Sequence, residues 1–476
     1  MISDIKNICC IGAGYVGGPT MSFIAYKCPH IKINVVDTNK TRIDLWNSED
    51  LNDLPIYEPG LKNIIKKCRG KNLHFSVNTE LGIKNADMIF ISVNTPTKTK
   101  GVGAGQASDL KWVEACARQV AQFASGYTIV VEKSTLPVKT AEVIKSILKN
   151  SYSNNKNEDP TFDVLSNPEF LAEGSAINDL ENPDRVLIGG DNDQAIMSLN
   201  KIYSYWVPKE KILHTNIWSS ELAKLTSNAF LAQRISSINS ISAICEVTGA
   251  DIREVSRAIG SDTRIGSKFL DSGPGFGGSC FKKDILNLVY LCKYYGLNEV
   301  GRFWESVVDL NSWHQNRISK LIIKKLFGTV SGKKIFVMGF AFKANTNDTR
   351  ESAAIKICKD LLNEGAILHI HDPKVLPSQI SNVLNIKESK CKKYIQNNHL
   401  DNAGEWIFVD NIIDGFKEVD AAIILTEWKE YNNLKWEIAS KLMRKPSWVF
   451  DTRSIISAQE VKKHNINFWK IGDGTQ

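Results

Sequence analysis

The feature that most constrains the fold is a glycine-rich turn between a short apolar run and a helical stretch. The run Ile8–Ile11 ends in Gly12-Ala13-Gly14-Tyr15-Val16-Gly17, and helix-compatible sequence follows to about Tyr26. A second apolar run begins at Ile31 and ends at Asp37. This order is the βαβ dinucleotide fingerprint, whose glycines turn the chain and approach a pyrophosphate while the distal acid binds a ribose diol. The acid favours NAD over NADP, because it would repel the extra phosphate.

Further strands with polar ends extend this predicted domain. Met88–Val93 leads into Asn94-Thr95-Pro96-Thr97, and Tyr127–Glu132 leads into Lys133-Ser134-Thr135. Ligands of doubly wound sheets bind at the carboxyl ends of the strands, so we expect both loops to line the cofactor site. The polar segment 151–160 is expected to be a surface loop or disordered.

A long helical pattern follows. From 215 to about 247 few breakers interrupt apolar residues at helical spacing, which predicts one helix that joins two domains. Ser219 and Ser220 are the candidate N-terminal caps. Lys224 and Asn228 lie four residues apart, so we expect them to project from one face of this helix.

Strand-like runs return beyond residue 330. They begin at Lys334, Ile367, Ala421 and Trp448, and the run at Trp448 is expected to be the last strand. Their alternation with helical sequence predicts a second parallel-sheet domain, and without the full fingerprint it should hold something other than a dinucleotide. The expected fold class is therefore α/β, with two Rossmann-like doubly wound parallel-sheet domains joined by a long central helix. The expected divisions are an NAD-binding Rossmann domain (1–214), a central helical linker (215–325) and a second Rossmann-like domain (326–476).

Composition and charge narrow the function classes. The net charge is +7, from 59 Lys and Arg against 52 Asp and Glu, but the basic residues are spread along the chain. We therefore expect no nucleic-acid partner, whereas an anionic small molecule suits a mildly basic protein. Ten cysteines are scattered without paired CxxC motifs, so neither a metal site nor a disulfide framework is expected. With no signal-peptide pattern and no apolar run of membrane-spanning length, we expect a cytoplasmic protein without membrane attachment.

A second glycine-rich stretch carries a candidate nucleophile. Four glycines lie within Gly273–Gly278, and Cys280 follows shortly before helix-like sequence from Ile285 to Tyr295. Glycine lets backbone N–H groups approach a bulky ligand. A thiol at a helix N-terminus beside Lys282 and Lys283 has reason to ionise easily. The alternative is an ordinary buried cysteine after a flexible turn.

Several motifs in order and spacing carry a family resemblance. The chain resembles the UDP-glucose 6-dehydrogenase branch of the UDP-glucose/GDP-mannose dehydrogenase family over nearly its whole length, and it looks most like the eukaryotic members. Besides the fingerprint, the motifs are Asn94–Thr97, Glu132–Thr135, Asn167–Gly174, Asn182–Gly190, Phe230–Ser240, Gly275–Phe281 with Lys283-Asp284, and Phe340–Lys343.

The resemblance implies oxidation of UDP-glucose to UDP-glucuronate with two NAD per turnover. In the family a cysteine traps an aldehyde as a thiohemiacetal, which is oxidised to a thioester that water cleaves. The residues that match the catalytic set are Cys280 as nucleophile, Lys224, Asn228 and Asp284 around the oxyanion charge or the water, Glu169 as general base of thioester hydrolysis, and Thr135 beside the water.

The resemblance also implies binding residues. The cofactor matches are Gly12, Ala13, Gly14, Tyr15, Val16, Gly17, Asp37, Arg42, Val93, Asn94, Thr95, Pro96, Thr97, Ser134, Thr135, Glu173, Cys280, Lys283 and Arg350. The substrate matches are Glu169, Phe170, Leu171, Ala172, Glu173, Lys224, Asn228, Arg264, the loop Asp271–Gly277 with Phe276, Phe342, Lys343 and Arg453. In the family the counterpart of Arg264 reaches a neighbouring subunit, which implies a homo-oligomer. Either a hexamer built as a trimer of dimers or a dimer fits, with dimerisation through 215–325 and UDP-sugar binding in 326–476.

The same residues have ordinary structural explanations. Glu169 could cap a turn after Pro168, Lys224 could be a solvated helix lysine, and Asp284 could only complement a helix N-terminus. Lys343 and Arg453 could be surface cations, Thr135 an ordinary strand-end residue, and His314, like the other histidines, matches no motif.

Two rival functions stay open at this point. One is a dehydrogenase of another nucleotide sugar, UDP-N-acetylmannosamine or GDP-mannose. The other is a nucleotide-sugar sensor without catalytic activity, against which the intact catalytic set argues.

The glycine loop departs from the animal members of the family. Its sequence Gly273-Pro274-Gly275 looks like that of bacterial members. Since Pro274 stiffens the loop, loop switching of the kind attributed to animal members is in doubt.

Overall fold

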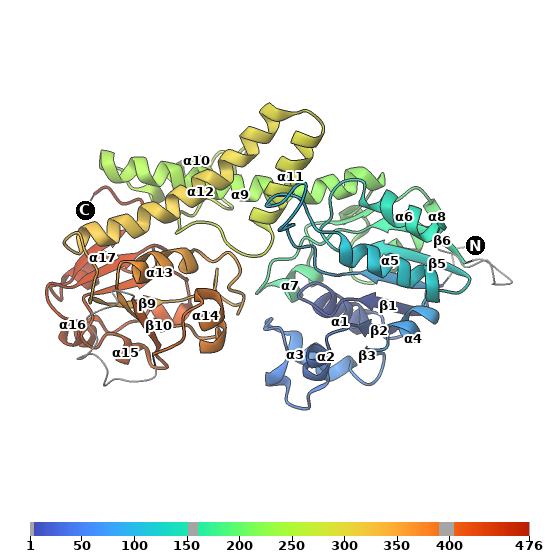
Figure 1. Cartoon of the computed structure of the whole chain (residues 1–476), viewed down its shortest axis with the longest axis horizontal. Coiled ribbons are helices and arrows are strands. Elements are labelled where there is room, and N and C mark those ends of the chain that lie inside the picture. Colours follow the sequence, from blue (N-terminus) through green and yellow to red (C-terminus); the bar gives the residue numbers. More distant parts are fainter. Residues whose placement is uncertain (1–3, 151–159, 390–403, 476) are drawn as a thin grey trace. The chain divides into compact units, whose positions relative to one another are not determined.

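The structure of the chain, a computed structural model, describes residues 4–150, 160–389 and 404–475. Contacts divide the chain into two compact units (Figure 1). The first comprises residues 1–228 with 286–301, and the second comprises 229–285 with 302–476. Each unit is built around one sheet. Among the described helices, none is both long and apolar enough to cross a membrane.

The first unit centres on an eight-stranded sheet. Its strands are β1 (Asn7–Ile11), β2 (Lys32–Val36), β3 (Leu73–Ser76), β4 (Met88–Ile91), β5 (Tyr127–Glu132), β6 (Thr161–Ser166), β7 (Val186–Gly189) and β8 (Ile212–Thr215). They lie in the order β3-β2-β1-β4-β5-β6-β7-β8. Neighbours pair in parallel except β6 and β7, which meet antiparallel at Ser166 and Gly189. The expected parallel sheet is therefore confirmed for all but this pair.

Helices cover this sheet and position its strand ends. They are α1 (Gly17–Lys27), α2 (Lys40–Asn47), α3 (Leu61–Cys68), α4 (Thr79–Lys84), α5 (Lys111–Phe123), α6 (Thr140–Asn150), α7 (Ala176–Glu181) and α8 (Asp193–Tyr203). Because β1 lies between β2 and β4, the strand order reverses there. Doubly wound folds bind ligands outside the carboxyl ends of the strands at such a reversal.

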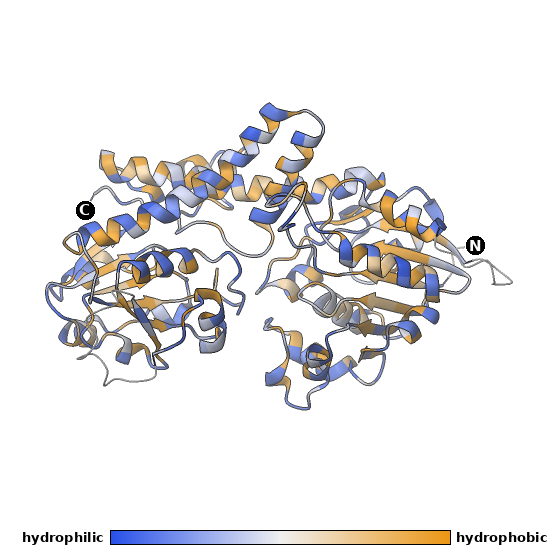
Figure 2. Ribbon diagram, viewed as in Figure 1, coloured by the Kyte–Doolittle hydropathy of each residue, from blue (hydrophilic) through white to orange (hydrophobic). Residues whose placement is uncertain are grey.

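The second unit centres on a six-stranded sheet in which all the described pairs are parallel. Its strands are β9 (Lys334–Met338), β10 (Ile367–His371), β11 (Glu405–Phe408), β12 (Ala421–Ile424), β13 (Trp448–Asp451) and β14 (Asn467–Lys470), in the order β11-β10-β9-β12-β13-β14. Its flanking helices are α13 (Ala353–Asn363), α14 (Pro377–Leu384), α15 (Ile412–Gly415), α16 (Trp436–Leu442) and α17 (Ala458–Lys462). In both sheets the strands are mainly apolar, and the helices alternate apolar and polar faces (Figure 2).

The remaining α-helices are α9 (Ile217–Thr248), α10 (Ile252–Gly260), α11 (Phe281–Tyr294) and α12 (Asn298–Lys325). The long helix predicted over 215–247 is confirmed as α9. The prediction that Ser219 or Ser220 caps it is wrong. Oδ1 of Asn216 accepts the N–H of Ser219 at 2.8 Å, so Asn216 caps the helix. Ser220 lies inside it, with Oγ 3.0 Å from Oγ of Ser166.

Short strands account for the other differences from the sequence-based expectations. The prediction that the run at Trp448 is the last strand is wrong, because β14 follows and pairs with β13. Strands β3, β7, β8 and β11, of four residues each, were not predicted. The three-part division at 214 and 325 stays a prediction. Residues 151–159, most of the segment expected to be a loop or disordered, lie outside the described residues.

Candidate active site

The glycine turn after β1 has the three glycine roles of a dinucleotide site. Gly12 has φ +112°, and a Cβ there would lie 2.2 Å from the carbonyl oxygen of Ser92. A Cβ on Gly17 would lie 2.0 Å from the carbonyl oxygen of Gly12, so this glycine lets α1 pack against the turn. Around Gly14 the space within 4 Å of an added Cβ is open. The turn therefore has room for a pyrophosphate, and its residues fit NAD.

Asp37 is held at the end of β2, facing the same turn. One of its carboxylate oxygens, Oδ2, accepts the backbone N–H of Ala13 and Nη1 of Arg42, each at 2.9 Å. The other oxygen accepts the N–H of Asn39 at 2.9 Å. These contacts orient the acid at the position where the fingerprint places the ribose diol. Ala13, Asp37 and Arg42, all predicted cofactor residues, are brought together.

The loops after β4 and β5 are tied to one another. Thr95 donates its hydroxyl to the carbonyl of Thr135 at 3.0 Å, and Ser134 donates to the carbonyl of Val93 at 2.7 Å. The Gly12 turn touches this loop pair through Ser92. Val93–Thr97, Ser134 and Thr135 thus gather beside the glycine turn, as expected from the carboxyl-end rule.

Glu169 is a buried carboxylate in the first unit. Its Oε1 accepts the N–H of Phe170 at 2.7 Å, and its Oε2 lies 2.9 Å from Nζ of Lys133. Lys133 is itself only 3% exposed. Burial alone would lower the pKa of Lys133, but Glu169 and Tyr203 raise it above its ordinary value. The sequence motif contained Lys133, yet nothing in its spacing indicated this partner.

Lys224 and Asn228 lie on the predicted single face of α9. Nζ of Lys224 donates to Oδ1 of Asn228 at 3.4 Å, and both side chains are buried. The solvated-lysine alternative is therefore wrong for Lys224. Its Nζ also lies 5.3 Å from the ring centroid of Phe170, which Arg185 covers at 3.8 Å. The structure thus joins Phe170 to the predicted oxyanion pair through cation–π contacts.

The rest of the Glu169–Glu173 segment is anchored by its backbone. The N–H of Ala172 donates to Asp179 at 2.9 Å, and the next turn is held by Glu58, which accepts the N–H of Gly174 at 2.6 Å. Leu171, also a predicted substrate residue, packs against the first unit's core.

In the second unit, the glycine loop before Cys280 is buried and clamped by three polar side chains. Asn239 accepts the N–H of Gly273 at 2.9 Å. Asn311 accepts the N–H of Phe276 at 2.9 Å and donates to its carbonyl at 3.1 Å. Nε2 of His314 lies 2.9 Å from the carbonyl oxygen of Gly273. His314 matched no motif, but it is a support of this loop.

Burial determines the charge state of His314. The pKa of this imidazole is lowered from 6.5 to about 4 by burial, with the nearby charge of Arg317 acting in the same direction. The ring is therefore neutral at pH 7, and the carbonyl of Gly273 requires that the proton be on Nε2.

Cys280 immediately precedes α11. Of the nine cysteines that the structure describes, it alone is exposed, which removes the buried-cysteine alternative. The helix N-terminus predicted beside it is confirmed. Asp284 lies in the first turn of α11, 1% exposed, with Oδ1 3.3 Å from Nζ of Lys283. Lys282 points to Glu351 instead, at 2.9 Å.

Predicted substrate residues meet at the carboxyl ends of β9 and β13. A Cβ on Gly277 would lie 2.9 Å from Cβ of Phe342. Nη2 of Arg453 donates to the carbonyl of Phe342 at 2.9 Å, and Arg453 also borders Gly273. Nζ of Lys343 lies 5.7 Å from the Phe342 ring. The glycine loop thus packs against a surface that carries Lys343 and Arg453, and Arg453 also forms an ion pair with Glu427 at 3.1 Å.

Two further predicted arginines are paired with neighbouring acids. The side chain of Arg350 forms an ion pair with Asp348 at 2.7 Å, and its carbonyl accepts the N–H of Gly278 at 2.9 Å. Arg264 is 87% exposed and pairs with Asp262 at 2.6 Å. Its predicted role toward a second subunit stays a prediction.

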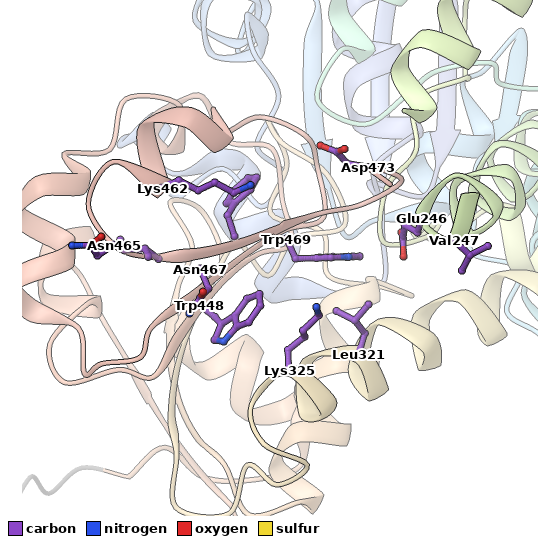
Figure 3. Close-up of a pocket in the computed structure, with 12 residues that line it drawn as sticks. Glu246, Val247, Leu321, Lys325, Trp448, Lys462, Asn465, Asn467, Trp469 and Asp473 are labelled. Atoms are coloured by element: carbon purple, nitrogen blue, oxygen red, sulfur yellow. The ribbon is translucent and has the colours of Figure 1, made fainter. Parts of the chain in front are cut away.

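A pocket of about 740 Å³ lies elsewhere in the second unit. Its lining includes Glu246, Leu321, Lys325, Trp448 and Asn467 (Figure 3). Trp448 and Asn467 are the first residues of β13 and β14, and Phe468, Trp469 and Asp473 extend the lining along the edge strand β14 and past its end. None of the predicted site residues lines it. In the described part of the chain, no group of three His, Cys, Asp or Glu residues could hold a metal ion.

Comparison with known proteins adds a family match along the chain. The matches are to the UDP-glucose/GDP-mannose dehydrogenase family: its NAD binding domain over residues 6–207, its central domain over 218–313 and its UDP binding domain over 336–458. The chain is 54% identical over 472 residues to UDP-glucose 6-dehydrogenase of Bos taurus, covering 98% of this chain and 92% of that protein. It is 52% identical over 477 residues to UDP-glucose 6-dehydrogenase of Drosophila melanogaster, covering 98% and 96%.

Solved structures share the fold. A UDP-glucose dehydrogenase from Pyrobaculum islandicum superposes with a TM-score of 0.82 at 28% identity, covering 99% of this chain and 98% of the other. A UDP-D-ManNAc dehydrogenase from Pyrococcus horikoshii has a TM-score of 0.79 at 24% identity, covering 99% and 100%. The second likeness supports the fold alone.

Proposed function

Because the chain belongs to the UDP-glucose/GDP-mannose dehydrogenase family, we propose that it oxidises UDP-glucose to UDP-glucuronate with NAD. The observation that carries the proposal is the exposed Cys280, which stands between a buried glycine loop and the N-terminus of α11. A dehydrogenase that stopped at the aldehyde would have no use for a nucleophile there. UDP-glucose is proposed as the substrate because the relatives at 52–54% identity are UDP-glucose 6-dehydrogenases.

The electron count determines the sequence of steps. Converting a primary alcohol to a carboxylate removes four electrons, so two hydrides leave the sugar carbon. NAD, when bound, accepts the hydride in each oxidation. The fingerprint turn, Asp37 and Arg42 would hold the cofactor, together with the loops after β4 and β5.

Cys280 acts between the two oxidations. Its thiolate adds to the aldehyde carbon, forming a C–S bond and placing a negative charge on the former carbonyl oxygen. Lys224 and Asn228 supply the donors that stabilise this oxyanion. Asp284, buried in the first turn of α11, is proposed to hold Lys283 and the water near the thiol.

Glu169 and Thr135 act in the last step. Water adds to the thioester carbonyl while Glu169 accepts one of its protons, and the C–S bond breaks to release the carboxylic acid and the Cys280 thiolate; the acid then loses its second proton to solvent. Thr135 orients the water. The carboxylate of Glu169 suits this task because it is buried and its Oε1 accepts a backbone N–H.

The uridine diphosphate is assigned to the second unit. Phe342 and the glycine loop would contact the nucleotide sugar, and Lys343 and Arg453 would neutralise the diphosphate. We also propose that the protein is a cytoplasmic homo-oligomer in which Arg264 reaches a neighbouring subunit.

Turnover of alternative sugars tests the substrate. The purified chain is supplied with NAD and, in separate reactions, UDP-glucose, UDP-N-acetylmannosamine or GDP-mannose, and NADH formation is followed. We expect UDP-glucose to have the highest kcat/KM. A preference for either other sugar would overturn the substrate, and NADH formation with none of them would favour a sensor without catalytic activity.

A further inference from the structure

Lys133 is a buried charged residue to which the proposed reaction assigns no role. It follows β5 directly, and its side chain is almost as inaccessible as the core around it. Its amine meets three oxygen atoms: Oε2 of Glu169 at 2.9 Å, Oδ1 of Asn167 at 3.1 Å and the hydroxyl of Tyr203 at 3.3 Å. A buried ammonium needs such partners, because an isolated one would lose its proton.

The contacts of Glu169 are unequal at its two oxygens. Oε2 accepts from Lys133 and, at 3.4 Å, from the hydroxyl of Thr20. Oε1 accepts only the N–H of Phe170 among the contacts that the structure describes. A carboxylate oxygen has two lone-pair directions, so Oε1 retains capacity to take a proton.

Other charged groups around this pair come from separate elements. Tyr203 on α8 donates to Oδ1 of Asn167 at 2.6 Å, which fixes the amide beside Lys133. Arg185 and Lys224 lie over the ring of Phe170, the residue that follows Glu169, at 3.8 and 5.3 Å from its centroid. Lys133 alone has a cation–carboxylate contact with Glu169 among the described ion pairs.

We propose that Lys133 is a positioning residue for thioester hydrolysis: through its contact with Oε2 it holds the Glu169 carboxylate turned so that Oε1 faces the attacking water. The inference rests on the proposed function, because it assigns work to the step in which Glu169 accepts a proton. Without Lys133 the buried carboxylate would be uncompensated and would take up a proton itself. It could then no longer accept one from water.

The test compares Lys133→Met with Lys133→Arg by rapid mixing with UDP-glucose and NAD. We expect K133M to keep the initial burst of NADH from the two oxidations, while steady-state turnover at pH 7 falls by roughly 100-fold. Raising the pH should restore turnover, with the acidic limb of its pH profile moved up by at least about one unit. K133R should recover most of the rate. The control is Lys201→Met, since Lys201 also pairs with an acid, Asp4, but is exposed; its kinetics should not change.

A purely structural role for Lys133 gives a different pattern. Burst amplitude, NAD binding and thermal stability would then fall together, and the pH profile would keep its shape; that result would overturn the proposal. If K133M does not fold, Lys133→Met combined with Glu169→Gln removes both charges and is compared with E169Q alone. Equal rates support action through Glu169, and a further tenfold loss contradicts it. Failure of the wild type to form NADH from UDP-glucose would instead contradict the proposed function.

Discussion

The backbone N–H of Ala13 donates to the carboxylate of Asp37 across 2.9 Å, which joins the glycine turn to the end of the neighbouring strand. The two halves of the fingerprint, 24 residues apart, are therefore held at a defined spacing before any ligand arrives. Because the acid is already oriented, little free energy is spent on ordering it when a ribose diol binds.

Replacing Asp37 by Asn should weaken NAD binding. The neutral amide accepts hydrogen bonds from the ribose diol more weakly than the carboxylate does, so the affinity for NAD should fall by about 10–100-fold. Calorimetric titration with NAD measures the change. The control is Asp44→Asn, at an exposed acid on the α2 helix that follows Asp37; this variant should bind NAD normally, and equal affinities for the two variants would remove Asp37 from the site.

Two glycines of the turn should respond in opposite ways to alanine. Gly14→Ala adds a methyl to open space, so the fold should keep its stability while NAD affinity falls by roughly 10–200-fold. Gly17→Ala drives a methyl into the carbonyl of Gly12, so the fold should lose about 1–3 kcal/mol or more. Thermal unfolding and NAD titration separate the two outcomes. An unstable G14A protein would contradict the assignment.

Cys280→Ser should abolish steady-state turnover. A serine hydroxyl is not ionised at neutral pH, so the rate should fall by at least roughly 1,000-fold. Binding of NAD and UDP-glucose should persist, because the glycine loop is held by Asn239, Asn311 and His314 rather than by the thiol. Wild-type rates in the serine variant would remove Cys280 from the reaction.

His314 should make the second unit acid-sensitive. Its folded pKa of about 4 lies below the unfolded value of 6.5. The unfolded chain therefore takes up the proton first as the pH falls, and stability present above pH 6.5 is lost toward pH 4. Between pH 7.5 and pH 5 the wild type should lose about 2 kcal/mol more than His314→Gln, measured by urea unfolding. His214→Gln, at an exposed histidine, should lose as much unfolding free energy between these pH values as the wild type. If H314Q lost as much as the wild type too, the account would be contradicted.

The fold could be predicted wherever its signal is local. The turn Gly12–Gly17, the strands on either side of it and the helix α9 each carry their pattern within a short window. Strands such as β3 and β14 could not be found, because each has only two apolar residues among its four, whereas the equally short β4 and β12 are apolar throughout. The antiparallel contact of Ser166 with Gly189 is likewise set by tertiary packing.

The site shows the same limit. Glycines and the exposed cysteine could be predicted, because their chemistry is visible in the residue type. The supports could not. His314 and Asn311 reach the loop from 41 and 35 residues away, and Lys133 meets Glu169 across two strand ends. The apolar spacing of a helix does not indicate which of its polar residues will contact a buried carbonyl, as His314 does on α12.

The stoichiometry of NADH formation tests the central claim most directly. A limiting amount of UDP-glucose is converted to completion with excess NAD, and NADH is counted against sugar consumed. The account predicts two NADH per UDP-glucose, with UDP-glucuronate as product, because the Cys280 adduct carries the sugar through both oxidations. One NADH per UDP-glucose, with an aldehyde released, would contradict it.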